Sequence, residues 1–415
     1  MLSTSRHFAA WEDGMFDPGS VRFEGPLKPY VDSFWAELRR QGYSPLSAGN
    51  LLRVSAHFSR WLAGCRLSVG DLSEDGVAQF LAHRRRERYT GFLTRRALRP
   101  LLEHLGRLGI VIRRATVIET PIDRLVSAYG EYLASERCLS ARTIRSYTDF
   151  ACEFAKKRFD SDDPIWDQLT PSDVTDFVKQ ESRRWSTGYC KLKVTWLRSL
   201  LRFLHLRGQI SRDLADCVPA VAGWRLAWLP KGLEPDQVER LLGSADHSTV
   251  LGRRDAAIVR LLVRLGLRAT DVAALELDDL DWRAGELVVC GKGRHQSRLP
   301  LPHDVGKAIA AYLRRGRPPS PTREVFLSNP APHLPLSPSG VVAVVRGALR
   351  RAGIAAGGAR MLRQTVATQI LRQGGSLSEI AHVLRHRHID TTAIYAKVDL
   401  SSLRTLVQPW PGSLS

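Results

Sequence analysis

The sequence predicts a mainly α-helical protein with a small β-sheet (α+β), arranged as two helical bundles followed by a mixed domain. Apolar residues recur at helical spacing through most of the 415 residues. Prolines and glycines interrupt this pattern at 218–234, where we expect a linker because these residues break helices. Beyond the linker, two short apolar segments flank a glycine-containing turn, which is typical of a β-hairpin. We therefore expect domains at 1–115, 116–222 and 230–405, and a C-terminal tail at 406–415.

The first domain resembles the second in sequence, which makes it a candidate duplicate. Phe58 and Phe154 stand at matching places, 96 positions apart (154 − 58), and the last helical pattern of each domain shares L-R-x-L-L-x-x-L-x-x-x-G. Ser73 and Thr170 also match, and both stand where a helix N-cap is expected. A chance alignment of two amphipathic bundles is the alternative. The conserved order of the matches favours a duplication.

The charge of the chain indicates a polyanionic partner. Lys and Arg number 61 against 42 Asp and Glu, a formal net charge of +19. A surplus of this size attracts nucleic acid, although the coding bias of a GC-rich genome also explains abundant arginine. Basic residues recur ahead of the last helical pattern in both bundles, where we expect a DNA-facing strip; a solvated helix face is the alternative. The strip comprises Arg84, Arg85, Arg86, Arg88, Arg95 and Arg96 in the first bundle and Arg183, Arg184, Lys191 and Lys193 in the second.

Cysteine usage and hydropathy indicate a soluble cytoplasmic protein. The six cysteines form no C-x-x-C pair, so we expect reduced thiols and neither a disulfide framework nor a zinc site. No apolar run approaches the ~20 residues of a membrane span. The N-terminus lacks the basic-then-apolar order of a secretory signal. We expect no metal, no other cofactor and no membrane partner.

The third domain mixes helical patterns with one strand pair. Helical spacing at 235–244, 252–266 and 269–275 precedes two strands at 286–290 and 296–301. The intervening GKGRH allows a tight hairpin because of its glycines. Further helices are expected at about 303–315, 338–352, 360–374, 376–384 and 390–397.

Five segments of the third domain appear in a distinctive order. They are GLRATD (266–271), GKGRHQSRLPL (291–301), RMLRQTVAT (360–368), LRH (384–386) and TTAIY (391–395). Together they resemble the catalytic domain of the tyrosine recombinases, also called the phage integrase family, and 116–222 is similar to that family's core-binding domain. The resemblance implies two helical SAM-like DNA-binding domains followed by a tyrosine-recombinase catalytic domain.

The resemblance also implies a site-specific DNA recombinase that cuts and rejoins DNA through a 3′-phosphotyrosine. Tyr395 matches the family's nucleophile. Arg268 and Arg363 match the arginines whose forked guanidinium groups hold the non-bridging phosphate oxygens. Lys292 matches the lysine that protonates the departing 5′ oxygen, and His386 matches a residue that hydrogen-bonds the scissile phosphate. The covalent bond stores the energy for rejoining, so ATP is not required.

Structural interpretations of these positions stay open. Asp271 lies one helical turn after Arg268 and suits a surface ion pair, while in the family an acid at this spacing orients the arginine. Lys292 is otherwise an exposed turn lysine.

The segment around the second arginine departs from the family. The family usually has His-x-x-Arg-His, whereas 360–364 reads R-M-L-R-Q. Arg360 lies one turn from Arg363 and can face the phosphate, but a guanidinium cannot act as a base. Gln364 replaces the second histidine at a packing or hydrogen-bonding position. The alternative function is therefore a catalytically weak or silent DNA-binding partner in a multi-recombinase complex.

The family resemblance extends to assembly. It implies double-stranded DNA as partner and a homo- or hetero-tetramer on that DNA. The doubled N-terminal half is similar to recombinases that transposon-like elements carry in groups, so both an integrase and a transposase are expected possibilities. A topoisomerase using the same chemistry is a third interpretation, which the duplicated helical domain disfavours. Residues 398–415 are expected to pack either on a neighbouring copy or on their own domain.

Overall fold

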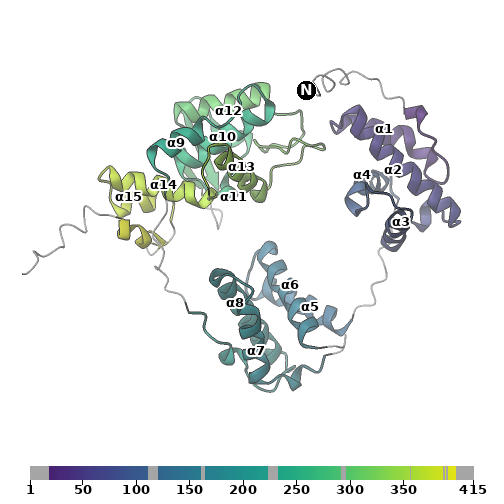
Figure 1. Cartoon of the computed structure of the whole chain (residues 1–415), viewed down its shortest axis with the longest axis horizontal. Coiled ribbons are helices and arrows are strands. Elements are labelled where there is room, and N and C mark those ends of the chain that lie inside the picture. Colours follow the sequence, from purple (N-terminus) through teal and green to yellow (C-terminus); the bar gives the residue numbers. More distant parts are fainter. Residues whose placement is uncertain are drawn as a thin grey trace, which may run out of the picture. The chain divides into compact units, whose positions relative to one another are not determined.

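The structure, a computed structural model, describes residues 18–110, 120–159, 164–222, 232–290, 296–355, 357–386, 388 and 391–398 (Figure 1). Within these ranges helices predominate and a single three-stranded antiparallel sheet is present, so the predicted mainly α class with a small sheet is confirmed. No helix in the described ranges is long and apolar enough to cross a membrane.

The N-terminal bundle has a core formed by the apolar faces of four α-helices. Phe58 is completely buried in this core and lies 4.9 Å from Phe80, measured between ring centroids. Burial of such aromatic side chains supplies much of the stability of a small bundle. The helices are α1 (Val31–Arg40), α2 (Pro45–Gly64), α3 (Glu74–Arg86) and α4 (Arg99–Arg107).

The second bundle repeats this plan. Its core holds Phe154, which is completely buried and lies 4.9 Å from Phe177 between ring centroids. Tyr129 is also fully buried and donates its hydroxyl to Ser199 at 2.9 Å, so its one polar atom is paired. The helices are α5 (Pro121–Ser135), α6 (Ala141–Arg158), α7 (Pro171–Ser182) and α8 (Thr187–Leu206).

Residues that match in sequence occupy matching places in the two bundles. Phe58 on α2 and Phe154 on α6 are each 0% exposed. Ser73 and Thr170 cap α3 and α7 by accepting the backbone N–H three residues on, so both predicted N-caps are confirmed. This correspondence supports the duplication, which stays a prediction.

Two members of the expected basic strip are interior residues. Arg84 is 5% exposed, and its guanidinium lies 4.1 Å from the centroid of the Tyr89 ring. Lys193 is 4% exposed and donates to Glu153 at 2.6 Å. The predicted surface position was wrong for Arg84 and Lys193. A charged side chain can be buried when a carboxylate or an aromatic face compensates its charge. The exposed members are Arg85, Arg86, Arg88, Arg95, Arg96, Arg183, Arg184 and Lys191.

The third domain is organised around α10 (Val250–Leu265). This helix is buried along most of its length and packs against α9, α12, α13 and α14. Because α10 packs against helices on several sides, its C-terminal end is fixed in position, and so is the beginning of the segment that follows it. The surrounding helices are α9 (Pro235–Leu242), α11 (Ala269–Ala273), α12 (His303–Arg315), α13 (Pro338–Arg351), α14 (Ala359–Arg372) and α15 (Leu377–Val383).

The sheet contains the predicted hairpin and one strand that the sequence did not reveal. β2 (Glu286–Cys290) pairs with β3 (Gln296–Pro300), as predicted. β1 (Leu280–Asp281) adds a third strand beside β2, and two residues are too few for a periodic sequence signal.

The last predicted α-helix, at 390–397, was wrong in type. The structure has a 3₁₀ helix, η9 (Ala393–Val398), and the backbone N–H of Tyr395 donates to the carbonyl of Thr392 at 2.9 Å. That three-residue spacing defines the tighter 3₁₀ turn, which commonly appears in short segments.

Candidate active site

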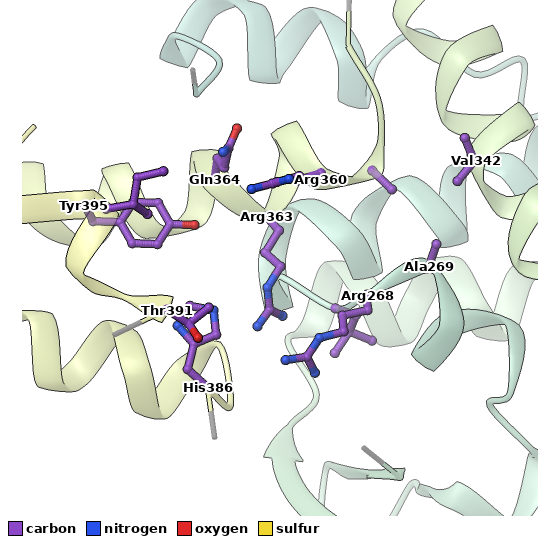
Figure 2. Close-up of a pocket in the computed structure, with 12 residues that line it drawn as sticks. Arg268, Ala269, Val342, Arg360, Arg363, Gln364, His386, Thr391 and Tyr395 are labelled. Carbon is purple, nitrogen blue, oxygen red and sulfur yellow. The ribbon is translucent and has the colours of Figure 1, made fainter. Parts of the chain in front are cut away.

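A pocket of about 440 Å³ lies in the third domain, where α11, α14, the end of α15 and η9 meet (Figure 2). It contains five of the six predicted site residues; Lys292 lies outside the described residues. In the described part of the chain, no group of three or more His, Cys, Asp or Glu side chains is placed to hold a metal ion. The lining residues are Leu267, Arg268, Ala269, Val342, Ala359, Arg360, Arg363, Gln364, His386, Thr391, Ile394 and Tyr395.

Arg363 is a buried residue that lines this pocket. It is 9% exposed, and its guanidinium donates to two backbone carbonyls, that of Gly266 at 2.5 Å and that of Leu384. Burial, followed by the charges of Arg268 and Arg385, lowers the pKa of Arg363 to about 10. The side chain therefore stays protonated at neutral pH. The two carbonyl groups that hold it are dipoles without net charge, so they do not neutralise the guanidinium.

Gly266 makes the anchoring of Arg363 possible. It ends α10 in the left-handed conformation, with φ of +57°. A Cβ atom at this position would lie 2.7 Å from Cδ2 of Leu384, so glycine is required for both conformation and space. The sequence motif GLR contained this residue, but its role depends on the packing of α10 against the end of α15.

Arg268 is fixed mainly through its backbone. It is the N-cap of α11 and donates its backbone N–H to Oδ2 of Asp271 at 3.1 Å. Its guanidinium donates to the carbonyl of Arg385 at 3.2 Å. The side chain is 38% exposed, so it reaches the open side of the pocket.

The structural alternative left open for Arg268, a surface ion pair with Asp271, does not describe the interior position of that acid. Asp271 is buried, with a side chain 4% exposed, and its short contact is to Arg385 at 2.8 Å. Nη1 of Arg268 is 3.9 Å from the same carboxylate oxygen. The motif LRH (384–386) contained Arg385 but did not reveal its pairing with Asp271, because the partner of a buried acid is set by tertiary packing.

His386 is held by a residue that the sequence reasoning missed. Its Nδ1 lies 2.7 Å from Oγ1 of Thr392, which is 0% exposed. Burial, together with the charges of Arg363 and Arg268, lowers the pKa of His386 to about 4. A neutral ring whose Nδ1 accepts from the threonine carries its proton on Nε2, where it can donate to an anion. The paired threonines of TTAIY were the available signal.

Tyr395 lies on η9 and is 5% exposed. Figure 2 shows its phenol oxygen directed toward the arginines of α14. Burial raises the pKa of Tyr395, and the positive charges of Arg363 and Arg360 oppose that rise. Arg360 therefore lines the pocket and is close enough to Tyr395 for its charge to favour the phenolate of that residue.

A buried tyrosine, three arginines and a histidine line one pocket, which is the set that the resemblance to the tyrosine recombinases implies. Residues 231–401 match the phage integrase family, and 126–208 match the phage integrase N-terminal SAM-like domain. The chain is 42% identical over 395 residues to "Putative integrase/recombinase y4rA" of Sinorhizobium fredii, covering 94% of this chain and 96% of that protein. It is 30% identical over 286 residues to tyrosine recombinase XerD of Listeria monocytogenes, covering 66% and 94%.

Solved structures share the fold. The XerH site-specific recombinase bound to a palindromic difH substrate has a TM-score of 0.53 at 17% identity, covering 70% of this chain and 97% of that chain. A lambda integrase dimer bound to a COC′ core site has a TM-score of 0.52 at 17% identity, covering 69% and 79%. The chain belongs to the phage integrase family. It is a site-specific DNA recombinase of the tyrosine type, as the sequence predicted.

Proposed function

We propose that Tyr395 is the nucleophile of this recombinase and that the pocket around it binds the scissile phosphate of double-stranded DNA. The phenol gives up its proton to water and its oxygen attacks phosphorus. The bond from phosphorus to the 5′ oxygen breaks as that oxygen takes a proton from Lys292, and the DNA stays bonded to the protein as a 3′-phosphotyrosine. Attack by another 5′-hydroxyl then releases the tyrosine and rejoins the strand. The observation that carries this proposal is the convergence of the predicted residues on one pocket.

The pocket's charge suits a phosphodiester whose negative charge grows during the attack. Arg268 and Arg363 present guanidinium groups that repel one another until an anion lies between them. Neutral His386 adds a hydrogen-bond donor. Arg360 stabilises the phenolate and replaces the family histidine in that respect, although it cannot accept the proton.

Lys292 remains our proposal for the acid that protonates the departing 5′ oxygen. The family resemblance supports it, as does its position in the sequence between two strands that pair. β2 and β3 are paired up to Cys290 and Gln296, the residues on either side of the segment that contains Lys292.

We propose the expected domain organisation as well. The bundles at 1–115 and 116–222 bind the DNA backbone through their exposed basic residues, and 230–405 carries the chemistry. A lambda integrase has been captured as a tetramer bound to a Holliday junction, and we propose a comparable tetramer here, of identical or related chains. Cytoplasmic location and carriage by a mobile element complete the proposal.

A silent DNA-binding partner is the second candidate function, and Arg360 in place of histidine favours it. The retention of Tyr395 beside Arg363 argues against it, because a protein that only binds DNA has no need for this pairing.

The experiment uses the purified full-length chain and labelled duplexes from both flanks of its own gene, including a nicked suicide substrate that prevents rejoining. We expect a protein–DNA adduct that survives denaturation and is absent with Tyr395→Phe. Tyr312→Phe is the matched control, because it removes a buried phenol oxygen of the same domain that contacts Leu327 and lies outside the pocket. Specific binding without any adduct would contradict the proposal and favour the silent partner; Arg360→His would then test whether that one change is responsible.

A further inference from the structure

The segment between α3 and α4 of the first bundle presents an aromatic side chain to solvent. Phe92 is 42% exposed, although burial of a phenyl ring would be favourable by the hydrophobic effect. Its backbone is left-handed, with φ of +57°, a conformation that costs energy in a residue with a Cβ atom. Neither feature stabilises the bundle, so Phe92 is a candidate for contact with a partner.

Two arginine side chains hold the backbone on either side of Phe92. Nη2 of Arg84 donates to the carbonyl of Gly91 at 3.0 Å. Nη2 of Arg85 donates to the carbonyl of Leu93, also at 3.0 Å. Arg84 is itself buried in the bundle, so the first of these anchors is part of the interior. The ring of Phe92 is therefore presented from a backbone that is held in place before any partner arrives.

The segment that carries Phe92 is strongly basic. Residues 84–96 contain six arginines and one acid, Glu87. Five of these arginines are exposed, and one of the five, Arg95, pairs with Glu74 at 2.6 Å. Charge complementarity therefore favours a polyanionic partner over an ordinary protein surface. Duplex DNA suits this arrangement, because phosphates can meet the guanidinium groups while an apolar side chain between them enters a groove.

The second bundle has a matching aromatic residue. The triplet T-G-F at 90–92 corresponds to T-G-Y at 187–189, 97 positions later (189 − 92), and the core residues Phe80 and Phe177 have the same offset. Tyr189 is 41% exposed and also stands among basic residues. The local structure differs, because the second triplet begins α8 and the first lies in a loop. Exposure of an aromatic ring in a basic segment is nevertheless common to both bundles.

We propose that Phe92 contacts thymine methyl groups in the major groove, so that the first bundle reads base sequence in addition to binding phosphates. This inference rests on the proposed binding of DNA by that bundle. The thymine methyl is the apolar group that base edges expose in the major groove, and phenylalanine is suited to contact it. Insertion between base pairs would require both faces of the ring to be free, whereas more than half of the surface of Phe92 is covered.

The test compares two forms of a duplex that the full-length chain binds, taken from the flanks of its own gene. One form contains thymine and the other contains uracil, which lacks only the methyl group. The unaltered chain should bind the thymine form more tightly. Phe92→Ala should lower the ratio of the two affinities about fourfold for each methyl group contacted. Alanine keeps a Cβ atom, so the backbone conformation is equally costly in both chains, and Phe92→Leu should lower the ratio less.

Leu46→Ala is the matched control. Leu46 is an apolar residue of the same bundle, 67% exposed on α2, and its replacement should leave the ratio unchanged. Arg88→Ala is a second comparison, because removal of a phosphate contact should weaken binding to both forms equally and reduce its salt dependence. Phe92→Ala should leave the salt dependence as it is.

An unchanged ratio in Phe92→Ala would overturn this inference alone, provided that the unaltered chain binds the duplex and forms the adduct. The same unchanged ratio with an altered oligomeric state of the free protein, measured by sedimentation velocity, would also overturn it and would assign Phe92 to a contact between protein chains. An unaltered chain that binds neither form of the duplex would overturn the proposed function together with this inference.

Discussion

Oγ1 of Thr392 lies 2.7 Å from Nδ1 of His386, and the threonine is completely buried. The contact links the segment just before Tyr395 to the segment after α15. When the hydroxyl donates, the histidine must carry its proton on Nε2. One buried hydroxyl thus orients a proposed phosphate-binding residue, and as a donor it also selects the tautomer.

Thr392→Val should slow DNA cleavage about five- to tenfold, the kinetic equivalent of about 1 kcal/mol for a lost hydrogen bond. Valine keeps the branched shape and removes the donor, so the ring of His386 loses its fixed tautomer. The measurement is the single-turnover rate of adduct formation. Thr392→Ser keeps the hydroxyl and should stay close to the unaltered rate; equal slowing by both changes would contradict the role of the hydroxyl.

Arg360→Ala should move the pH dependence of cleavage to higher pH. The charge of Arg360 opposes the burial that raises the pKa of Tyr395, so its removal raises that pKa further. At any fixed pH below the pKa, less phenolate is then present and cleavage slows. Rates measured between about pH 6 and pH 9 report the shift. Arg360→Lys retains a positive charge and should shift the profile less, whereas an unmoved profile for Arg360→Ala would argue against phenolate stabilisation.

His386 should contribute no inflection to cleavage near pH 6.5. Burial and the neighbouring arginines lower the pKa of His386 to about 4, so the ring is already neutral at pH 6. The same shift affects folding. Because the unfolded chain binds a proton more readily, stability is lost as pH falls from about 6.5 toward about 4.

Urea denaturation at pH 7 and at about pH 5 tests this effect. His386→Gln cannot titrate, so this variant should lose less stability on acidification than the unaltered chain. An equal loss in both proteins would show that His386 is not the group responsible.

Gly266→Ala should destabilise the third domain by about 1–3 kcal/mol, from the left-handed backbone and the contact with Leu384. Cleavage should also slow, because the carbonyl of Gly266 anchors Arg363. Gly285→Ala is the matched comparison: its φ is +66°, but a Cβ atom there meets nothing within 4 Å. Thermal unfolding of the two variants separates backbone strain from steric contact, and equal losses would exclude a steric contribution at Gly266.

The sequence by itself determined the features that depend on residues close to one another in the chain. Helical periodicity predicted the bundles, and two short apolar segments around a glycine-containing turn predicted the hairpin. Short-range rules predicted the caps at Ser73 and Thr170. The ordered motifs identified Arg268, Arg363 and Tyr395 as candidate site residues. In the structure these three residues line one pocket.

Only the tertiary structure decided how that pocket is held. Asp271 and Arg385 are 114 residues apart in the chain, so no periodic pattern connects them. The burial of Arg84 and Lys193, which the sequence assigned to a surface strip, is likewise decided by which aromatic rings and carboxylates the fold places beside them. Local sequence fixes which face of a helix is apolar, whereas the partner of a buried charge depends on segments that meet only after folding.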